Sequence, residues 1–384
     1  MLAYGKQSIC QTDIDAVIGV LTGDFLTQGP KVPEFEDALK RVTGAEHTIA
    51  TNSATSALHL ACRALGVGPG DLVWTSPITF VASANCVLYT GADIDFVDID
   101  PVTLNMCPAA LHAKLAQAKE SGRVPKAVIP VHMAGFPCDM QSIHDLAKEY
   151  GFAIIEDASH ALGAMDNGMN VGGCEYSDIA VFSFHPVKMI TTGEGGAACT
   201  NNSELAETMR RQRSHGVTRD PQLMSCMTQA PWRYEQLELG YNYRMTDIEA
   251  ALGVSQVAKL PIFLHARDRI AKFYQSSLTS TPLLLPSKRC FGRSSWHLYI
   301  VQMSEPTEEQ RLSLYEFMRE RNILLNVHYE PVHLQPFYQA KGFKSGDFPS
   351  AEIYASRCFS LPIHPRLSDE EMNLVVSSLK EFFK

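Results

Sequence analysis

Strand-like apolar runs alternate with helix-like segments between residues 47 and 200, and this alternation restricts the fold more than any other feature of the sequence. The strand-like runs are HTIATNS, DLVWTSP, ADIDFVDID, KAVIPVH, FAIIEDA and IAVFSF. The segments with apolar residues three and four positions apart are TSALHLACRALG, TFVASANCVLYTG, PAALHAKLAQAKE and DMQSIHDLAKEYG. Such alternation predicts an α/β fold with a mostly parallel sheet and helices on both faces. Functional side chains are then expected at the carboxyl ends of the strands.

The pattern changes further along the chain, where a long helical pattern covers residues 246–277. The segments that follow are mixed: a strand-like WHLYIVQM, a helix-like EEQRLSLYEFMRERN and a final helix in SDEEMNLVVSSLKEFF. Ser368 is expected to cap this last helix, with Glu371 completing a capping box. We therefore expect a large α/β domain over residues 1–250 and a smaller α+β domain over residues 251–384.

Composition and charge argue against several classes of partner. The 384 residues carry a formal net charge of −9 without a basic stripe, so nucleic acid is not expected as a partner. No apolar run approaches the roughly 18–20 residues that span a bilayer, and the start of the chain lacks the blocks of a signal peptide. The ten cysteines are dispersed without a CxxC pair, as in a reduced protein. We expect a cytoplasmic protein without membrane contact.

Common motifs of nucleotide and metal chemistry are missing from the sequence. It contains no Walker A, HExxH or GxSxG pattern. The glycine-rich GVGPGD follows a helix and precedes a strand, the reverse of the first turn that a nicotinamide-dependent enzyme needs. His328 and His333 lack a cysteine or carboxylate cluster at suitable spacing, so no metal site is expected.

Four features near predicted strand ends indicate a functional site only when they are considered together. Asp157 follows an apolar strand in IIEDASHALGA, and Lys188 follows the next one in SFHPVKMITTGEGG, 31 residues later. Small hydroxyl residues in TNSATSALHL precede one helix, and Phe80 opens another in SPITFVASAN. Taken singly, a helix-capping aspartate, a surface lysine, an ordinary N-cap and a core aromatic residue are the better interpretations.

A lysine, a carboxylate, an aromatic ring and a helix N-terminus at one sheet edge are together what pyridoxal 5′-phosphate requires. The lysine amine condenses with the cofactor's aldehyde as a Schiff base. The carboxylate keeps the pyridine nitrogen protonated, which makes the ring an electron sink. The aromatic side chain stacks on the ring, and the helix N-terminus holds the phosphate. In such a site, desolvation and the cationic cofactor should lower the pKa of Lys188, which must be neutral to act as a base.

With this set in place, the sequence resembles the DegT/DnrJ/EryC1 family of sugar aminotransferases along nearly its whole length. The shared motifs are LTQGPKVPEFE, NSATSALHL, SPITFVASAN, DIDPVTLN, IEDASHALGA, SFHPVKMITTGEGG, GYNYRMTDIEAALG and LPIHPRLSDEEM. The resemblance implies the type I, aspartate aminotransferase-like fold, L-glutamate as amino donor and a homodimer with shared active sites. Within the family, the subgroup that aminates C4 of a UDP-linked 4-keto-6-deoxy-2-acetamido sugar for pseudaminic acid biosynthesis is the most similar. The stretches that carry this likeness are YGKQSI, LTQGPKV, SPITFVASANC and the SFHPVK and TTGEGG parts of SFHPVKMITTGEGG.

Carried over position by position, the resemblance gives Lys188 the role of Schiff-base lysine and Asp157 that of partner to the pyridine nitrogen. The implied cofactor-binding residues are Ala54, Thr55, Ser56, Phe80, Asp157, His160, Ser183, Lys188 and Asn242, the last reaching the phosphate from the neighbouring subunit. The implied substrate-binding residues are Lys6, Leu26, Thr27, Gln28, Gly29, Tyr243, Asn326, His328 and Tyr329. Met189 departs from the pattern, because proline is expected directly after the lysine.

Three alternatives to this interpretation differ in what they require of the sequence. Another nucleotide-4-keto-sugar aminotransferase, of the perosamine or 4-amino-arabinose type, would share the same cofactor set, and the nucleotide is not readable directly. Sugar 3-dehydratases of the family carry histidine at the lysine position, so Lys188 argues against that reaction. A non-catalytic regulatory member would not need the complete set of lysine, aspartate, aromatic ring and phosphate cradle.

Overall fold

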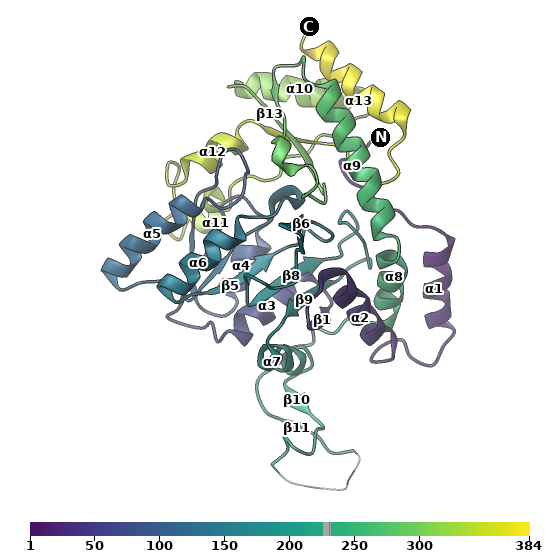
Figure 1. Cartoon of the computed structure of the whole chain (residues 1–384), viewed down its shortest axis with the longest axis vertical. Helices are drawn as coiled ribbons and strands as arrows, with labels where there is room; N and C mark the ends of the chain where they lie inside the picture. Colours follow the sequence, from purple (N-terminus) through teal and green to yellow (C-terminus); the bar gives the residue numbers. More distant parts are fainter. Residues whose placement is uncertain (226–229, 231) are drawn as a thin grey trace.

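The centre of the molecule is a seven-stranded sheet with the strand order β1-β9-β8-β5-β4-β2-β3 (Figure 1). The computed structural model describes residues 1–225, 230 and 232–384. Neighbouring strands from β8 to β3 pair in parallel, whereas β9 runs antiparallel to both β8 and β1. The strands are β1 His47–Thr51, β2 Leu72–Thr75, β3 Asp93–Phe96, β4 Ala127–Ile129, β5 Ala153–Asp157, β8 Ile179–Ser183 and β9 Gly196–Thr200. The predicted α/β fold with a mostly parallel sheet is confirmed.

Six of the seven strands coincide with predicted strand-like runs, and β9 is the exception. Its sequence, GAACT, begins at the last glycine of GEGG and has too few β-branched or aromatic residues to stand out as a strand. The strand is nevertheless buried throughout, and its Ala198 pairs with Val181 of β8 and with Ile49 of β1. Small side chains suit this position because the helix α3 (Ala54–Ala64) packs against the strand.

Helices cover both faces of the sheet, as the alternation predicts. Helices α3, α4 and α7 lie on one face, and α2, α5 and α6 lie on the other. On β5, Ile155 joins the core under α3 and α4, and its neighbour Ile154 joins the core under α5 and α6, because successive side chains of a strand point to opposite faces. The bounds are α2 Lys31–Thr43, α4 Ala82–Leu88, α5 Pro108–Ser121, α6 Met140–Tyr150 and α7 Ser203–Arg213.

The C-terminal part has its own antiparallel sheet, β12-β13-β14, and its own apolar core. The strands β12 Leu283–Leu284, β13 Tyr299–Met303 and β14 Cys358–Leu361 pack with the helices α9 Leu260–Ser277, α10 Glu308–Glu320 and α13 Asp369–Phe382. The predicted cap of the last helix is confirmed, since the Ser368 hydroxyl accepts the Glu371 N–H at 3.2 Å and the Glu371 carboxylate accepts the Ser368 N–H at 2.9 Å.

Shorter elements complete the chain. They are α1 Gln11–Leu21, α8 Asp247–Val257, α11 Pro336–Gln339, α12 Pro349–Ala355, β6 Met165–Asp166, β7 Met169–Asn170, β10 Val217–Thr218 and β11 Glu235–Gln236, with single turns η1 Met133–Gly135, η2 Lys288–Cys290 and η3 Val332–Leu334. Strands β10 and β11 form the base of an arm that projects from the body of the molecule (Figure 1). The described residues of this arm are 217–225, 230 and 232–239.

The long helical pattern of residues 246–277 forms two helices rather than one. Helix α8 ends at Val257, and α9 begins at Leu260 with Pro261 in its first turn. Proline lacks the N–H of a helix interior and clashes with the preceding turn, so it ends one helix and is tolerated at the start of the next. The predicted domain boundary falls at residue 250, inside α8, which packs against α1 and α2. The division into residues 1–250 and 251–384 stays a prediction.

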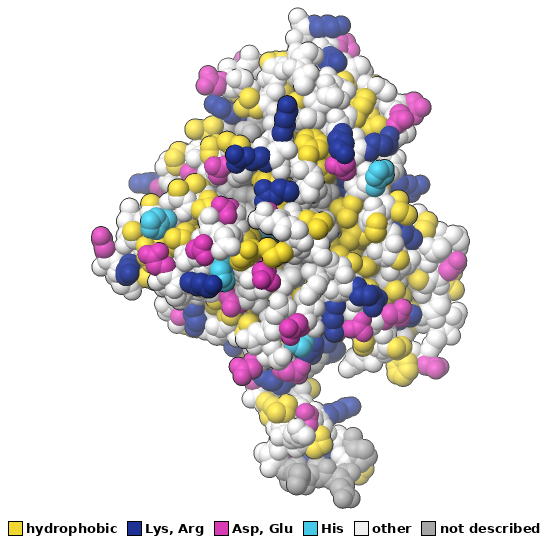
Figure 2. All heavy atoms as spheres, in the orientation of Figure 1, with side chains coloured by type: hydrophobic (Ala, Val, Ile, Leu, Met, Phe, Trp, Pro, Cys, Tyr) yellow, Lys and Arg dark blue, Asp and Glu magenta, His cyan; other side chains and the backbone are white. Residues whose placement is uncertain are grey.

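Charged side chains of both signs are interspersed on the face of the molecule drawn in Figure 2. Over the part of the chain that the structure describes, no helix combines the length and the apolar character that crossing a bilayer requires. On the arm, Trp232 and Leu239 are 78% and 71% exposed, which is unusual for large apolar side chains.

Candidate active site

A cavity of about 560 Å³ lies at the carboxyl ends of β5 and β8, where the fold predicts a functional site. Its walls come from the N-terminal segment, the start of α3, the segment before α4, the two strand ends and a C-terminal loop. The polar and aromatic residues that line it are Tyr4, Ser53, Thr55, Thr79, Phe80, Asp157, Ser159, His160, Ser183, His185, Lys188, Glu194, Asn326, His328 and Tyr329. Lys188 and Asp157, far apart in the sequence, thus face one cavity.

Lys188 lies in the loop that joins β8 to β9. The ends of this loop are held together, because the Phe184 N–H donates to the Gly195 carbonyl at 2.9 Å and the Thr192 N–H donates to the Phe184 carbonyl at 3.0 Å. Burial lowers the pKa of Lys188 to about 8, although the Asp157 carboxylate acts in the opposite direction. The predicted direction is confirmed, and an appreciable fraction of this amine is neutral near physiological pH.

Asp157 is the last residue of β5 and is almost completely buried. Its Oδ2 accepts the Ser83 hydroxyl at 2.5 Å, and its Oδ1 accepts the Ser159 N–H at 3.1 Å. Each carboxylate oxygen therefore has a donor, which offsets the cost of burying the charge.

The start of α3 forms a cradle for an anion. Ser53 is the N-cap, and its hydroxyl accepts the Ser56 N–H at 3.1 Å. The N–H groups of Ala54 and Thr55, in the first turn, have no partner within the helix, and both residues line the cavity. A helix N-terminus with free N–H groups is a ready site for phosphate.

Gly196 allows this cradle to sit against the sheet. A Cβ on Gly196 would lie 2.4 Å from the Ala54 nitrogen and 2.5 Å from the Ser53 carbonyl carbon. Both are backbone atoms, which cannot give way without moving the helix. The last glycine of GEGG therefore sets how closely β9 approaches the start of α3.

A histidine and a tyrosine close the opposite side of the cavity. Tyr329 and His160 share a hydrogen bond between the hydroxyl and Nε2 at 3.1 Å, and the His160 ring lies 4.4 Å from that of His297. Burial, together with the charge of Lys188, lowers the pKa of His160 well below its usual value, so the ring is neutral. Its Nδ1 is buried and has no hydrogen-bond partner within the described residues.

These groups fit pyridoxal 5′-phosphate. The Nδ1 of His160 has no hydrogen-bond partner within the described residues and would be satisfied by a polar group. The start of α3 favours an anion, and the buried Asp157 carboxylate favours a cationic group beside it. Phe80 is 60% exposed at the cavity, so its ring face is available for stacking. Lys188 would supply the amine for covalent attachment.

The structure brings most of the predicted cofactor residues to this cavity. Ala54, Thr55, Phe80, Asp157, His160, Ser183 and Lys188 all line it, as do Asn326, His328 and Tyr329 from the predicted substrate set. Ser56 does not line it, because its hydroxyl donates to the Asn52 side chain at 2.6 Å and its N–H is committed to the cap.

Other predicted residues lie away from this cavity. Asn242 is exposed, and the Tyr243 hydroxyl meets His59 Nδ1 at 3.0 Å. Lys6 lines a separate cavity of about 10 Å³ behind Lys188, together with the buried Met189.

The segment from Leu26 to Gly29 lies beside the start of α8. Thr27 pairs with Thr246, and the Gly29 N–H donates to Asp247 at 2.8 Å. Within one chain these residues do not line the cavity that holds Lys188.

Several lining residues escape the sequence analysis. Tyr4, His185 and Glu194 line the cavity, and Ser83 and His297 contact its predicted residues. His185 and Glu194 stand within the SFHPVKMITTGEGG motif, which offered a signal for them. Ser83 lies within the SPITFVASAN motif, but a serine in an apolar helix is usually a neutral packing residue, so the motif did not single it out.

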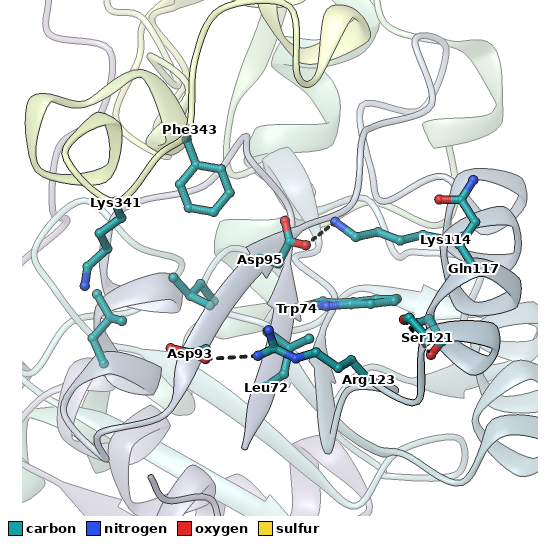
Figure 3. Close-up of a pocket in the computed structure, with 13 residues that line it drawn as sticks. Leu72, Trp74, Asp93, Asp95, Lys114, Gln117, Ser121, Arg123, Lys341 and Phe343 are labelled. Atoms are coloured by element: carbon teal, nitrogen blue, oxygen red, sulfur yellow. Dashed lines mark hydrogen bonds and ion pairs between the residues drawn. The ribbon is translucent and has the colours of Figure 1, made fainter. Parts of the chain in front are cut away.

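A larger cavity, of about 740 Å³, opens at the outer edge of the sheet beside β3 and α5 (Figure 3). Its charges largely neutralise one another: Lys114 pairs with Asp95 at 2.7 Å, and Arg123 pairs with Asp93 at 3.1 Å. The Lys114 ammonium also lies 5.0 Å from the centre of the Trp74 ring. By size alone this cavity would be the better candidate for an active site. The polar groups that are not already paired with one another, however, lie in the cavity around Lys188.

A lysine and a carboxylate at the ends of adjacent parallel strands, facing a helix N-terminus, define the class of pyridoxal phosphate-dependent transferases with the aspartate aminotransferase fold. The chain belongs to the DegT/DnrJ/EryC1/StrS aminotransferase family, which it matches over residues 7–380. It is a pyridoxal phosphate-dependent aminotransferase acting on nucleotide sugars.

Two curated relatives are similar over the whole chain. The UDP-4-amino-4,6-dideoxy-N-acetyl-β-L-altrosamine transaminase of Campylobacter jejuni is 38% identical over 380 residues, covering 99% of this chain and 96% of the relative. The spore coat polysaccharide biosynthesis protein SpsC of Bacillus subtilis is 37% identical over 389 residues, covering 100% and 97%.

Solved structures agree with the fold. Helicobacter pylori PseC, an aminotransferase involved in the biosynthesis of pseudoaminic acid, superposes with a TM-score of 0.91 at 33% identity, covering 100% of this chain and 99% of that one. The pyridoxal phosphate form of a proposed Streptococcus pneumoniae sugar aminotransferase superposes with a TM-score of 0.88 at 30% identity, covering 99% and 97%.

Proposed function

We propose that this enzyme transfers an amino group from L-glutamate to C4 of a UDP-linked 4-keto-6-deoxy-2-acetamido sugar. The product would be UDP-4-amino-4,6-dideoxy-N-acetyl-β-L-altrosamine, for pseudaminic acid biosynthesis. The observation that carries the reaction type is the half-buried Lys188 amine, which shares a cavity with Asp157 and whose pKa is lowered to about 8. The similarity to the C. jejuni transaminase and to H. pylori PseC supports the substrate.

Lys188 would carry the proton transfers of both half-reactions. Its neutral amine takes a proton from Cα of the amino donor and returns one to the substrate side, and the pKa near 8 suits both roles. Bound pyridoxal phosphate supplies the aldehyde and the electron-withdrawing ring. Asp157 holds a proton on the ring nitrogen, and Phe80 covers one face of the ring.

The phosphate would be held by Ala54 and Thr55 at the start of α3, with Ser183 nearby at the end of β8. The sugar would lie toward the C-terminal loop. There the His328 Nδ1 and the Ser360 hydroxyl meet at 2.8 Å, and the Tyr4 ring lies 4.7 Å from the His328 ring. These contacts support a role for Asn326, His328 and Tyr329 in orienting the substrate.

We also propose a homodimer with shared active sites. Asn242 and the segment from Leu26 to Gly29 are expected at the phosphate and the sugar nucleotide, yet neither lines the cavity of its own chain. The exposed apolar side chains of the arm, Trp232 and Leu239, support a surface that a second copy covers.

A second candidate is an aminotransferase for a different nucleotide-4-keto sugar, of the perosamine or 4-amino-arabinose type. The similarity to SpsC, at an almost equal identity, favours keeping this alternative. The two candidates share every residue around Lys188 and differ only in the sugar nucleotide.

A substrate panel tests the proposal. Purified enzyme is incubated with L-glutamate and UDP-, GDP- or dTDP-linked 4-keto sugars, and the amino-sugar products are identified by mass spectrometry and NMR. The Lys188→Ala variant serves as the inactive control. Amination at C4 of the UDP-2-acetamido sugar is expected; turnover of a GDP or dTDP sugar without any UDP product would replace it by the second candidate.

A further inference from the structure

The carboxylate of Asp157 is held by a side chain that belongs to neither the predicted cofactor set nor the substrate set. Ser83, in α4, is completely buried, and its hydroxyl donates to Asp157 Oδ2 at 2.5 Å. The distance is at the short end of the range for a hydroxyl bonded to a charged oxygen. The contact spans 74 residues of sequence, so only the tertiary fold creates it.

A second hydroxyl stands behind the first. Thr79 is also buried, and its Oγ1 lies 2.7 Å from the Ser83 Oγ. Ser83 has one hydroxyl proton, and the carboxylate at 2.5 Å is a better acceptor than the Phe80 carbonyl at 3.4 Å. Thr79 must then be the donor in its contact with Ser83. The result is a directed chain from Thr79 through Ser83 to Asp157, in which each hydrogen bond strengthens the next.

Both hydroxyl residues come from the segment that also carries Phe80. This segment therefore has two contacts with the proposed cofactor site. The exposed ring of Phe80 lines the cavity, and the Ser83 hydroxyl reaches it indirectly through the carboxylate of Asp157. The same short segment thus contacts both the open cavity and the carboxylate that is expected to meet the pyridine nitrogen.

We propose that Ser83, backed by Thr79, is a positioning residue that keeps Asp157 in its carboxylate form, so that the proton shared with the cofactor stays on the ring nitrogen. Hydrogen bonds donated to a carboxylate favour its charged form. Without the Ser83 donor, the proton of the Asp157–pyridine pair moves toward the carboxylate, and the ring loses its positive charge. The proposal rests on the role of pyridoxal phosphate in the proposed function, but not on the identity of the sugar.

The titratable groups that interact with Asp157 include Lys188, Cys86 and Tyr329, and His160 lines the same cavity. Burial raises the pKa of both the Cys86 thiol and the Tyr329 hydroxyl and lowers that of His160, so these three remain neutral. Lys188 is the one nearby cation among them. Ser83 and the Ser159 N–H are thus the direct hydrogen-bond donors to the carboxylate among the described residues.

The test compares the protonation of the ring nitrogen in wild type and Ser83→Ala. Cofactor-free protein is reconstituted with pyridoxal phosphate labelled with ¹⁵N in the ring, and the ¹⁵N chemical shift is recorded. We expect a protonated nitrogen in the wild type and a shift toward the neutral value in Ser83→Ala. The dissociation constant of the cofactor should rise about tenfold, as for the loss of one hydrogen bond to a charged group.

Three further variants separate this role from a general structural one. Ser83→Thr keeps the hydroxyl and should restore the wild-type ¹⁵N shift, whereas Thr79→Val should give an intermediate shift and serves if Ser83→Ala does not fold. Ser378→Ala removes a hydroxyl that is also buried, in α13, and should leave the shift unchanged. A wild-type shift in Ser83→Ala or Thr79→Val, or a neutral nitrogen in the wild type, would overturn the proposal. Because no sugar is present, failure of the substrate panel leaves this result intact.

Discussion

Replacing Gly196 by alanine should damage cofactor binding without touching any group that performs chemistry. The new Cβ would lie 2.4 Å from the Ala54 nitrogen, about 1 Å short of ordinary van der Waals contact, which begins near 3.4 Å. Since the obstructing atoms are backbone, the start of α3 must move by a large part of that ångström. The N–H groups of Ala54 and Thr55 would move with it, away from the phosphate position.

Two magnitudes follow from this displacement. Overpacking a tightly packed site costs about 1–3 kcal/mol, which should appear in urea unfolding of the cofactor-free protein. A misplacement of about 1 Å can cost on the order of 10²-fold in function, which corresponds to about 2.7 kcal/mol of binding free energy. The dissociation constant, measured by titrating cofactor-free protein with pyridoxal phosphate, should therefore rise about 100-fold.

The matched control is Gly68→Ala. No atom lies within 4 Å of a Cβ on Gly68, and its backbone does not require glycine, so both the stability and the dissociation constant should stay near wild type. A Gly196→Ala variant that binds the cofactor within twofold of wild type would show that the cradle tolerates the extra atom. The assigned role of this glycine would then be wrong.

Three other perturbations have distinct signatures. The folded-state pKa of Lys188 is depressed to about 8, so the rate at which cofactor-free protein captures pyridoxal phosphate should rise with pH and level off above about 8. The unfolded chain keeps the lysine proton up to about pH 10.5, so the stability of wild type relative to Lys188→Met should increase as the pH rises from 8 to 10.5. A stability difference that does not change with pH would contradict the desolvation of this amine. Tyr329→Phe removes the hydroxyl that meets His160 and should lower kcat/KM for the sugar about fivefold, which corresponds to about 1 kcal/mol. An unchanged value would remove this contact from the mechanism. Lys259→Ala leaves the buried Asp13 carboxylate without the ammonium 2.6 Å away and should cost about 2 kcal/mol in urea unfolding, with no change in cofactor affinity as the internal control.

The sequence alone predicts the part of the fold in which strands and helices alternate. Six strands and four helices follow from alternating patterns because each buries an apolar face of recognisable period. Strand β9 could not be found this way, since its small side chains are dictated by the close packing of α3, a tertiary fact. The break between α8 and α9 could have been read from Pro261, which marks the first turn of the second helix.

For the site too, the residues that follow from local sequence patterns were predictable, and those that depend on tertiary contacts were not. Lys188 and Asp157 were predictable only together with Phe80 and the start of α3, because all of them lie near the ends of apolar strands and parallel strands end at one edge. The contact between Ser83 and Asp157 spans 74 residues and leaves no trace in local patterns. Asn242 and the segment from Leu26 to Gly29 came from family resemblance only, because nothing in the local pattern of these residues marks them as ligands of a cofactor or substrate.

The position of β9 has a consequence for the order in which the molecule can assemble during synthesis. Strand β1 carries the start of α3 at its carboxyl end, yet its partner in the sheet is β9, which ends at Thr200. Until the ribosome has released those residues, the first strand has no edge to join. The start of α3, which is proposed to hold the phosphate, is made early, but β1 joins the sheet only after the strand that directly follows the lysine loop. A nascent chain cut short before β9 would keep the packing of α3 on α4 and β8 but would lack the strand that links β1 to β8.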